Sequence, residues 1–299
     1  MLELRDVPPD PDRTAVAITR GVERRVATRF VTAQEARAHA ERAVERTAET
    51  STWVDVVEGP DVVGWLWLVA DTEELLVHDA VLDAPDRVSE LLVPLVERAR
   101  VSHARMLGVA VTLDDPTLAA FAGLPGMRVR ATNMVLSLEA EISDPDPVAL
   151  HPMTDQEFEV WVEGEVEGYA DEIAATGLSP ERALERSRTQ MAELLPEGRQ
   201  SPGMEFFLAR VGDEVVGDLW LETGETMAFV YNVEVLAEQR RRGYGAAIMN
   251  AGARHCRDTG HPYLGLNVFG HNPNARSLYD KLGYRVTVDY SALDVADAG

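Results

Sequence analysis

The sequence predicts a mixed α/β (α+β) fold in two halves that repeat one order of elements. Three observations support this prediction. A strand-like run, 227–236, leads through a glycine-containing turn into a helix-like run, 246–258. Both halves contain short apolar, β-branched runs that follow helical runs. A segment with two prolines, 141–148, divides the chain near its middle.

The first half contains runs typical of both helices and strands. Helices are expected at 32–47, 90–100 and 116–121, and strands at 51–57, 62–69, 75–82, 106–113 and 128–138. The segment 141–148 follows. Its prolines cannot donate hydrogen bonds to a sheet, so we interpret it as a linker.

The second half begins with two expected helices. The first, 155–175, carries Phe158, Val162 and Val166 at four-residue spacing. The second is preceded by Ser179 and Pro180, a good N-cap followed by a residue suited to the first helical position, and ends near residue 195. Strands are expected at 205–211, 214–221, 227–236, 263–269 and 285–290, with helices after the glycine turn and around 272–282.

Composition limits the possible functions. The 299 residues suffice for two ordinary domains, and 45% apolar with 26% charged residues is typical of a globular protein. The net charge of −23 argues against a nucleic-acid partner and is compatible with a cationic substrate, although acidic surfaces also serve solubility. The seven histidines form no pair at metal-ligand spacing, so we expect no metal.

The subcellular location is predicted from the apolar runs, the first residues and the cysteine content. We expect no membrane association, because no apolar run has spanning length and the first residues lack a secretion-signal pattern. The only cysteine, Cys256, excludes an internal disulfide and favours the cytoplasm. No base is positioned beside Cys256 by sequence, so we interpret it as a packing residue.

The turn 239–245, Gln-Arg-Arg-Arg-Gly-Tyr-Gly, is the most informative segment. The first N–H groups of a helix lack internal partners and carry partial positive charge. Gly243 and Gly245 let the backbone approach a ligand closely, and the three arginines add cationic charge. The turn therefore predicts a diphosphate site. It is neither a Walker loop nor a G-x-G-x-x-G fingerprint, since position 248 is Ile; the pattern is R-x-x-G-x-G.

A second motif follows at the expected distance. Asn272, Ala275, Tyr279, Gly283 and Tyr284 match N-x-x-A-x-x-x-Y-x-x-x-G-[FY]. With both motifs in this order, residues 150–295 resemble the general N-acetyltransferase (GNAT) superfamily. The resemblance implies two GNAT-like domains, each a twisted, mostly antiparallel sheet flanked by helices: a degenerate domain, 1–142, and a catalytic domain, 148–299.

The resemblance also implies a reaction: transfer of an acetyl group from acetyl-CoA, as cosubstrate, to a primary amine of a small molecule. Tyr279 is the expected acid that protonates the thiolate, although it could instead be a packing aromatic. Glu234 is the expected base; a solvated or salt-bridged acid is the alternative. The backbone of Val233 and Val235 is expected to pair with the pantetheine arm, where two strands separate, unless both strands pair normally there.

The expected cofactor-binding residues lie in the two motifs. They are Arg240, Arg241, Arg242, Gly243, Tyr244, Gly245, Asn272 and Ala275. Asn272 could instead cap the last helix. Asn232 and Asn267 could hold a bridging water between the separated strands.

The acceptor is less clearly indicated. In this superfamily the two helices of 155–195 line the substrate pocket, and here Glu159, Glu163 and Glu167 form one acidic stripe. The stripe could attract a cationic amine such as a polyamine or aminosugar, or it could simply be a solvated face.

The first half lacks the features of the motifs. Its counterpart of the glycine turn, 83–89, has no glycine and two acids, and Phe121 occupies the place of Tyr279. Acidic charge would repel a diphosphate, so we expect no cofactor there. We expect this domain to shape the acceptor cleft or a homodimer interface rather than to have an activity of its own.

Several functions remain open at this point. Within the superfamily, a mycothiol synthase-like enzyme, an antibiotic acetyltransferase or an enzyme that acetylates a protein amine is possible. A GNAT-fold module that binds acyl-CoA without chemistry is a second class. A structural protein in which 239–245 is only a turn is a third.

Overall fold

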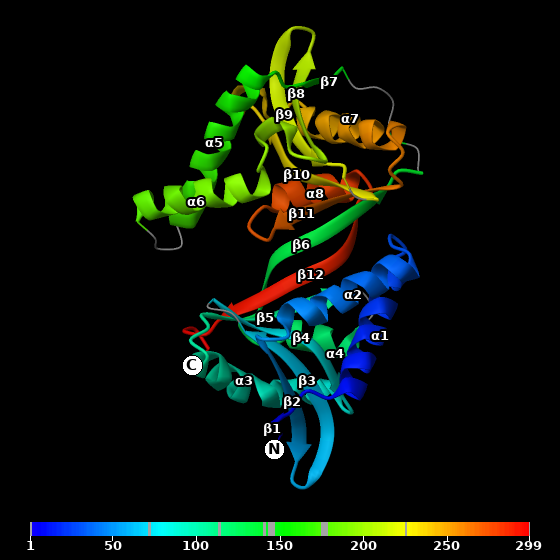
Figure 1. The fold of residues 1–299 in the computed structure, drawn as a ribbon, viewed down its shortest axis with the longest axis vertical. Coiled ribbons are helices and arrows are strands. Elements are labelled where there is room, and N and C mark those ends of the chain that lie inside the picture. Colours follow the sequence, from blue (N-terminus) through cyan, green and yellow to red (C-terminus); the bar gives the residue numbers. More distant parts are fainter. Residues whose placement is uncertain are drawn as a thin grey trace. The chain divides into compact units, whose positions relative to one another are not determined.

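The computed structural model describes residues 2–70, 73–112, 115–139, 142, 147–174, 179–224 and 226–298. Most of the predicted linker, 141–148, lies outside these residues. The chain forms two compact units (Figure 1). Unit 1 comprises Met1–Val135, Asn267–Ser277 and Arg285–Gly299, and unit 2 comprises Leu136–Leu266 and Leu278–Tyr284. The units are not continuous in sequence, and the boundaries 1–142 and 148–299 stay a prediction.

The two halves of the sequence repeat one order of elements. The first half contains β1 (Glu3–Val7), α1 (Pro11–Ala27), α2 (Ala33–Thr47), β2 (Ser51–Glu58), β3 (Asp61–Ala70), β4 (Glu74–Leu82), the 3₁₀ helix η1 (Pro85–Leu91), α3 (Leu92–Val101), β5 (Met106–Thr112), α4 (Pro116–Ala122) and β6 (Arg128–Ser137). The second half contains β7 (Ala149–Pro152), α5 (Asp155–Ala174), α6 (Pro180–Leu194), β8 (Met204–Val211), β9 (Glu214–Glu222), β10 (Met227–Val235), the 3₁₀ helix η3 (Ala237–Gln239), α7 (Tyr244–Asp258), β11 (Tyr263–Phe269), α8 (Pro273–Lys281) and β12 (Arg285–Asp294). Only the short 3₁₀ turn η2 (Gly198–Gln200) interrupts the correspondence. The prediction of a mixed α/β fold with a repeated half is confirmed.

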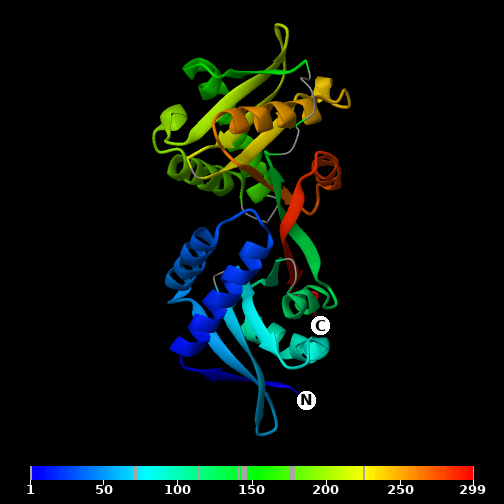
Figure 2. The ribbon, with the colours of Figure 1, turned by 90° about the vertical axis from the view of Figure 1, so that its right-hand side faces the viewer.

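The strands of unit 1 lie in the order β1-β2-β3-β4-β5-β12-β6. All neighbouring pairs in this order are antiparallel except β4 with β5. The last strand of the sequence, β12, therefore lies between β5 and β6, the final strands of the first half (Figure 2). Its pairing covers Val288–Asp294 against β5 and Arg285–Ala292 against β6.

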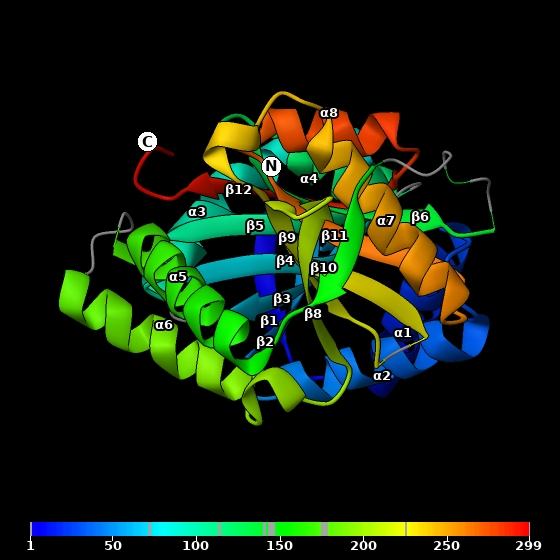
Figure 3. The same cartoon turned by 90° about the horizontal axis from the view of Figure 1, so that it is seen from above.

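The strands of unit 2 lie in the order β11-β10-β9-β8-β7, and only β10 and β11 are parallel. Helices cover both faces, α5 and α6 on one side and α7 on the other (Figure 3). Neighbouring residues of β9 show this directly. A Cβ at Gly217 would lie 2.9 Å from Ile248 of α7, whereas Asp218 contacts Trp161 of α5. Side chains alternate across a strand, so Asp218 belongs to the α5 face.

A local signal explains where α2 begins. Thr32 caps α2 with a capping box: its hydroxyl accepts from the Glu35 N–H at 3.2 Å, and the Glu35 carboxylate accepts from the Thr32 N–H at 2.8 Å.

The core of unit 1 includes the fully buried Val54, Leu66 and Phe121. Among the described residues, no helix combines the length and apolar character that crossing a membrane requires.

Candidate active site

The strands β10 and β11 pair over only part of their length. The parallel pairs join Met227–Val230 to Tyr263–Leu266. Beyond them, Tyr231 forms a bulge, and Asn232–Val235 pair with β9 alone among the described residues. The strands thus separate at the place where the sequence predicts that Val233 and Val235 expose backbone groups. The carbonyl of Val235 accepts a hydrogen bond from Arg240 Nε at 3.0 Å, and the pairing of this edge with pantetheine stays a prediction.

The predicted diphosphate turn is a sharp strand-to-helix connection. Arg241 and Gly243 have φ of 64° and 88°, the left-handed region, which is uncommon for a residue with a side chain. Gly243 is the N-cap of α7 and has no side chain to bond the first N–H groups of the helix. Apart from its chain neighbours, no atom of the described residues lies within 4 Å of where its Cβ would be. The N-terminus of α7 is therefore open to a ligand on this side.

Gly245 connects the turn to α8. A Cβ at this position would lie 3.3 Å from Leu278 of α8 and 3.8 Å from Val235 of β10. The absence of a side chain thus lets α8 pack closely on the beginning of α7. Tyr279 follows Leu278 directly, so the two sequence motifs lie together in space.

The three arginines of the turn have different environments. Arg240 forms an ion pair with Glu234 at 3.1 Å, with both side chains about half exposed. Arg242 donates to the buried Gln239, which in turn donates to Glu214. Arg241 is exposed, and its side chain makes no ion pair or hydrogen bond with any described residue. It is the arginine that is most available to a phosphate.

Glu234, the predicted base, forms a salt bridge, which is the alternative role that the sequence also allowed. The residue opposite it on β9, Asp218, is buried. Burial, with the added charge of Glu234, raises the pKa of Asp218 to about 6, and the N–H of Trp161, 3.1 Å away, opposes this rise. The sequence analysis missed Asp218. The signal was a single acid inside an apolar strand, Val215–Leu221.

Aromatic residues line the α5 face beside Asp218. Trp161 and Trp220 meet edge to face at 5.5 Å, and Tyr231, at the bulge, stacks on Trp220 at 4.8 Å. The amide of Asn232 donates to Glu165 of α5 at 2.8 Å. Trp220 is buried and Tyr231 is exposed, so Tyr231 is the accessible part of this aromatic cluster, which carboxylates and an amide border.

The acidic stripe of α5 lies on the exposed side of the helix. Glu159, Glu163 and Glu167 are exposed, as expected for a solvated face, whereas Glu165 points to β10. Asn267 donates to Asn133 at 2.7 Å and Asn232 to Glu165, and a water that bridges these two amides stays a prediction.

Tyr279 is buried in α8, and burial raises the pKa of its phenol. Its ring lies 5.7 Å from that of Tyr284. Asn272 caps α8, because its Oδ1 accepts from the Ala275 N–H at 3.1 Å. Cofactor contacts of Asn272, Ala275 and Tyr244 stay predictions.

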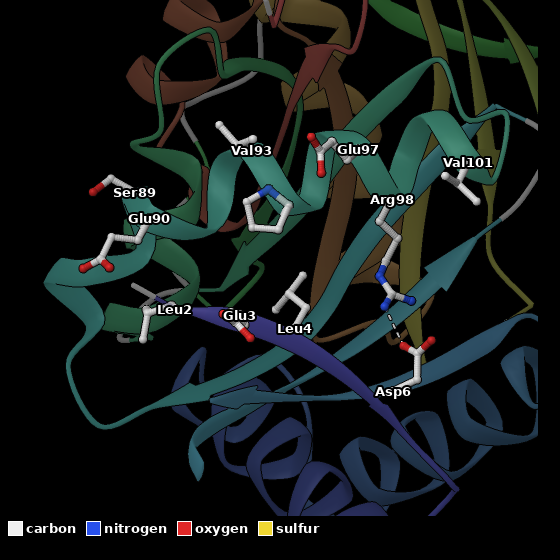
Figure 4. A pocket seen from close by; sticks show the side chains of 11 residues that line it. Leu2, Glu3, Leu4, Asp6, Ser89, Glu90, Val93, Glu97, Arg98 and Val101 are labelled. Atoms are coloured by element: carbon white, nitrogen blue, oxygen red, sulfur yellow. Dashed lines mark hydrogen bonds and ion pairs between the residues drawn. The ribbon is translucent and has the colours of Figure 1, made fainter. Parts of the chain in front are cut away.

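Other features lie outside this site. A groove of about 920 Å³ lies in unit 1 between β1 and α3, where Arg98 and Asp6 form an ion pair (Figure 4). None of the predicted site residues line it. Burial raises the pKa of Cys256 to about 12, in agreement with a packing role. In the described ranges, no cluster of three histidine, cysteine or acidic residues could hold a metal.

Comparison with known proteins gives three findings. A family model described as "Acetyltransferase (GNAT) family" matches residues 173–284. "Uncharacterized N-acetyltransferase YycN" of Bacillus subtilis (strain 168) is 30% identical over 146 residues, which are 47% of this chain and 94% of that protein. A mycothiol acetyltransferase of Nocardiopsis dassonvillei is 32% identical over 148 residues, 46% of this chain and 42% of that protein.

A solved structure covers nearly the whole chain. The GCN5-related N-acetyltransferase from Sphaerobacter thermophilus matches 98% of this chain and 96% of its own, with a TM-score of 0.59 and 15% identity. At this identity the likeness shows a shared fold, and it includes the first half.

Proposed function

The chain belongs to the GNAT acetyltransferase family, and on this basis we propose that its second half transfers an acetyl group from acetyl-CoA to a primary amine of a small molecule. The observation that carries the proposal is the packing of Leu278 on Gly245. It places α8, which carries the buried Tyr279, against the beginning of α7 and its open N-terminus. An anion site and a proton donor are the two features that a thioester of coenzyme A requires.

The turn fits the diphosphate of coenzyme A. The first N–H groups of α7 and the exposed guanidinium of Arg241 are the donors, and the space beside Gly243 is free of described atoms. Acetyl-CoA supplies the activated acyl group. The residues of this chain bind its diphosphate and move protons.

We propose Asp218 as the principal base, with Glu234 as the second candidate. A carboxylate with a pKa of about 6 is largely ionised near neutral pH and can accept a proton from the ammonium group of the acceptor, directly or through water, so that the neutral amine attacks the thioester carbonyl. The new C–N bond forms as the C–S bond breaks. Tyr279 then donates its proton to the thiolate, or hydrogen-bonds it.

The acceptor site suits a cationic or aromatic amine. Tyr231, exposed and stacked on the buried Trp220, offers an aromatic ring, and Asp218 and Glu165 add negative charge beside it. The similarity to a mycothiol acetyltransferase keeps an aminosugar-containing acceptor as one alternative, and an antibiotic amine is another. We keep the cytoplasm as the proposed compartment, because Cys256 is free and buried. A homodimer stays a prediction.

The test is release of CoA thiol from acetyl-CoA with a panel of polyamines, aminosugars and aminoglycosides, corrected for hydrolysis without amine. The proposal expects saturable, amine-dependent release that Tyr279→Phe reduces. Binding of CoA without amine-dependent release from any member of the panel would favour the non-catalytic acyl-CoA-binding module.

A further inference from the structure

Unit 1 contains a small cavity, lined by both apolar and polar side chains, that the proposed activity does not use. It measures about 120 Å³ and lies between α1, α2 and the strands β3, β4 and β5. A water molecule occupies roughly 30 Å³, so the cavity is large enough for a small organic molecule. Its polar lining includes Arg25, His39, Trp67, His78 and Thr112, and alanines and Ile18 form an apolar wall.

This cavity lies at the place in the first half that corresponds to the Trp220–Tyr231 pair of the candidate acceptor site in the second half. The parallel pairs of β4 and β5 end at Val77 and Val109, and His78 forms a bulge. His78 meets Trp67 with ring centroids 4.2 Å apart, as Tyr231 meets Trp220 in the second half. The strands thus separate at the corresponding place in both halves, and in the first half the cavity lies there.

Three hydrogen-bond donors at the cavity lack partners among the described residues. The indole N–H of Trp67 and the hydroxyl of Thr112 are buried without a hydrogen bond. The guanidinium of Arg25, only partly exposed, forms no ion pair or hydrogen bond with the described part of the chain. Buried donors are nearly always paired, so this arrangement indicates a missing acceptor.

The charges around the cavity also favour an anion. Arg20 and Arg24 are balanced by the buried Asp79 and Asp115, with contacts of 2.6 to 3.3 Å. No such carboxylate balances Arg25 in the described residues. Burial and the charges of Arg24 and Arg46 lower the pKa of Arg25. Burial and nearby arginines also lower the pKa values of His39 and His78 to about 4, so both rings are neutral at pH 7.

We propose that this cavity binds a small carboxylate with a short apolar chain. The guanidinium of Arg25 supplies the charge, and the indole N–H of Trp67 and the hydroxyl of Thr112 bond the carboxylate oxygens. The apolar wall beside Ile18 covers the alkyl chain. A free phosphate would gain nothing from this wall. The site is thus a second, anion-selective site in a chain of net charge −23.

The experiment titrates the full-length protein with propionate and, separately, with inorganic phosphate, at constant ionic strength. The indole N–H resonances are followed by NMR, and Trp67→Phe assigns the resonance of Trp67. We expect a saturable shift of the Trp67 resonance with propionate at millimolar concentrations and none with phosphate. Thr112→Val, which keeps the shape, is expected to weaken binding about tenfold.

Two further variants complete the test. Arg25→Gln is expected to abolish the shift, whereas Arg37→Gln, on the exposed side of α2 and paired with Glu41, leaves it unchanged. If Arg25→Gln does not fold, the wild-type titration and Thr112→Val still decide. No saturable shift of Trp67, or an equal response to phosphate, overturns the proposal. Neither result affects the acetyltransferase proposal, because the cavity shares no residue with that site.

Discussion

Asp218 and Glu234 face each other across β9 and β10, but only Glu234 has a cationic partner. Arg240 forms an ion pair with Glu234 at the surface. Asp218 is buried beside Trp161, and the charge of Glu234 contributes to the rise of its pKa. The two carboxylates therefore lie in different environments although they are neighbours, and the pKa of the buried Asp218 is raised to about 6. The base is better assigned to the buried one.

The two carboxylates can be distinguished by matched amide substitutions. Asp218→Asn removes the proposed base and is expected to lower kcat by roughly 10²- to 10⁴-fold. Glu234→Gln removes an exposed, ion-paired carboxylate and is expected to lower kcat less than about tenfold. Initial rates of CoA release with a saturating amine compare them. The reverse order would assign the base to Glu234.

The elevated pKa of Asp218 also predicts a pH dependence of stability. Its folded-state pKa of about 6 exceeds the ordinary 3.8, so its contribution to stability is fully present below about pH 4 and is lost as the pH rises through 6. Asp218→Asn cannot titrate. Relative to wild type, the variant should gain up to roughly 3 kcal/mol of unfolding free energy between pH 4 and pH 7. Chemical denaturation at both pH values measures this; a difference that does not change with pH would contradict it.

Two substitutions of Gly245 distinguish steric from electrostatic effects on CoA binding at the turn. A Cβ there would meet the mobile end of Leu278 at 3.3 Å and Val235 at an ordinary contact distance of 3.8 Å, so Gly245→Ala is expected to weaken CoA binding only a few-fold. Gly245→Asp adds negative charge where the diphosphate binds and should abolish binding. Gly164→Asp adds the same charge on α5 as a control, where the described residues outside the helix's own backbone leave the new Cβ free of contacts within 4 Å. Titration calorimetry with CoA measures all three, and wild-type affinity in Gly245→Asp would exclude the turn as the binding site.

Tyr279→Phe tests the proton donor. The ring is buried, and phenylalanine keeps its packing, so the fold and CoA affinity should change little. Turnover should fall far more, by roughly 10²-fold or more, because the thiolate loses its acid. Steady-state kinetics with calorimetry as a control separates the two effects. Unchanged turnover would show that water or another group protonates the thiolate.

Much of the fold could be predicted, because periodicity and turn residues act over short distances. Strand β11 was predicted with its observed bounds, and the helix after Ser179 and Pro180 begins where expected. The strand β1, the helix α1 and the strand β7 were not predicted. The N-cap Asp10, which accepts from the Asp12 N–H at 2.9 Å, was a usable signal for α1.

What the sequence could not show depends on contacts between distant segments. The position of β12 between β5 and β6 has no local signature. The pKa of Asp218 depends on Trp161, 57 residues earlier, and on Glu234 opposite it. The pairing of Arg240 with Glu234 required the turn geometry itself. Motifs thus indicated the candidate site, but the proposed roles of its acids depend on the folded arrangement.

A crystal structure with bound CoA tests the central claim most directly. The account predicts the diphosphate at the backbone N–H groups of residues 241–246, with the thiol directed toward Tyr279. Density for the diphosphate at another place, such as beside η1 of the first half, would contradict it.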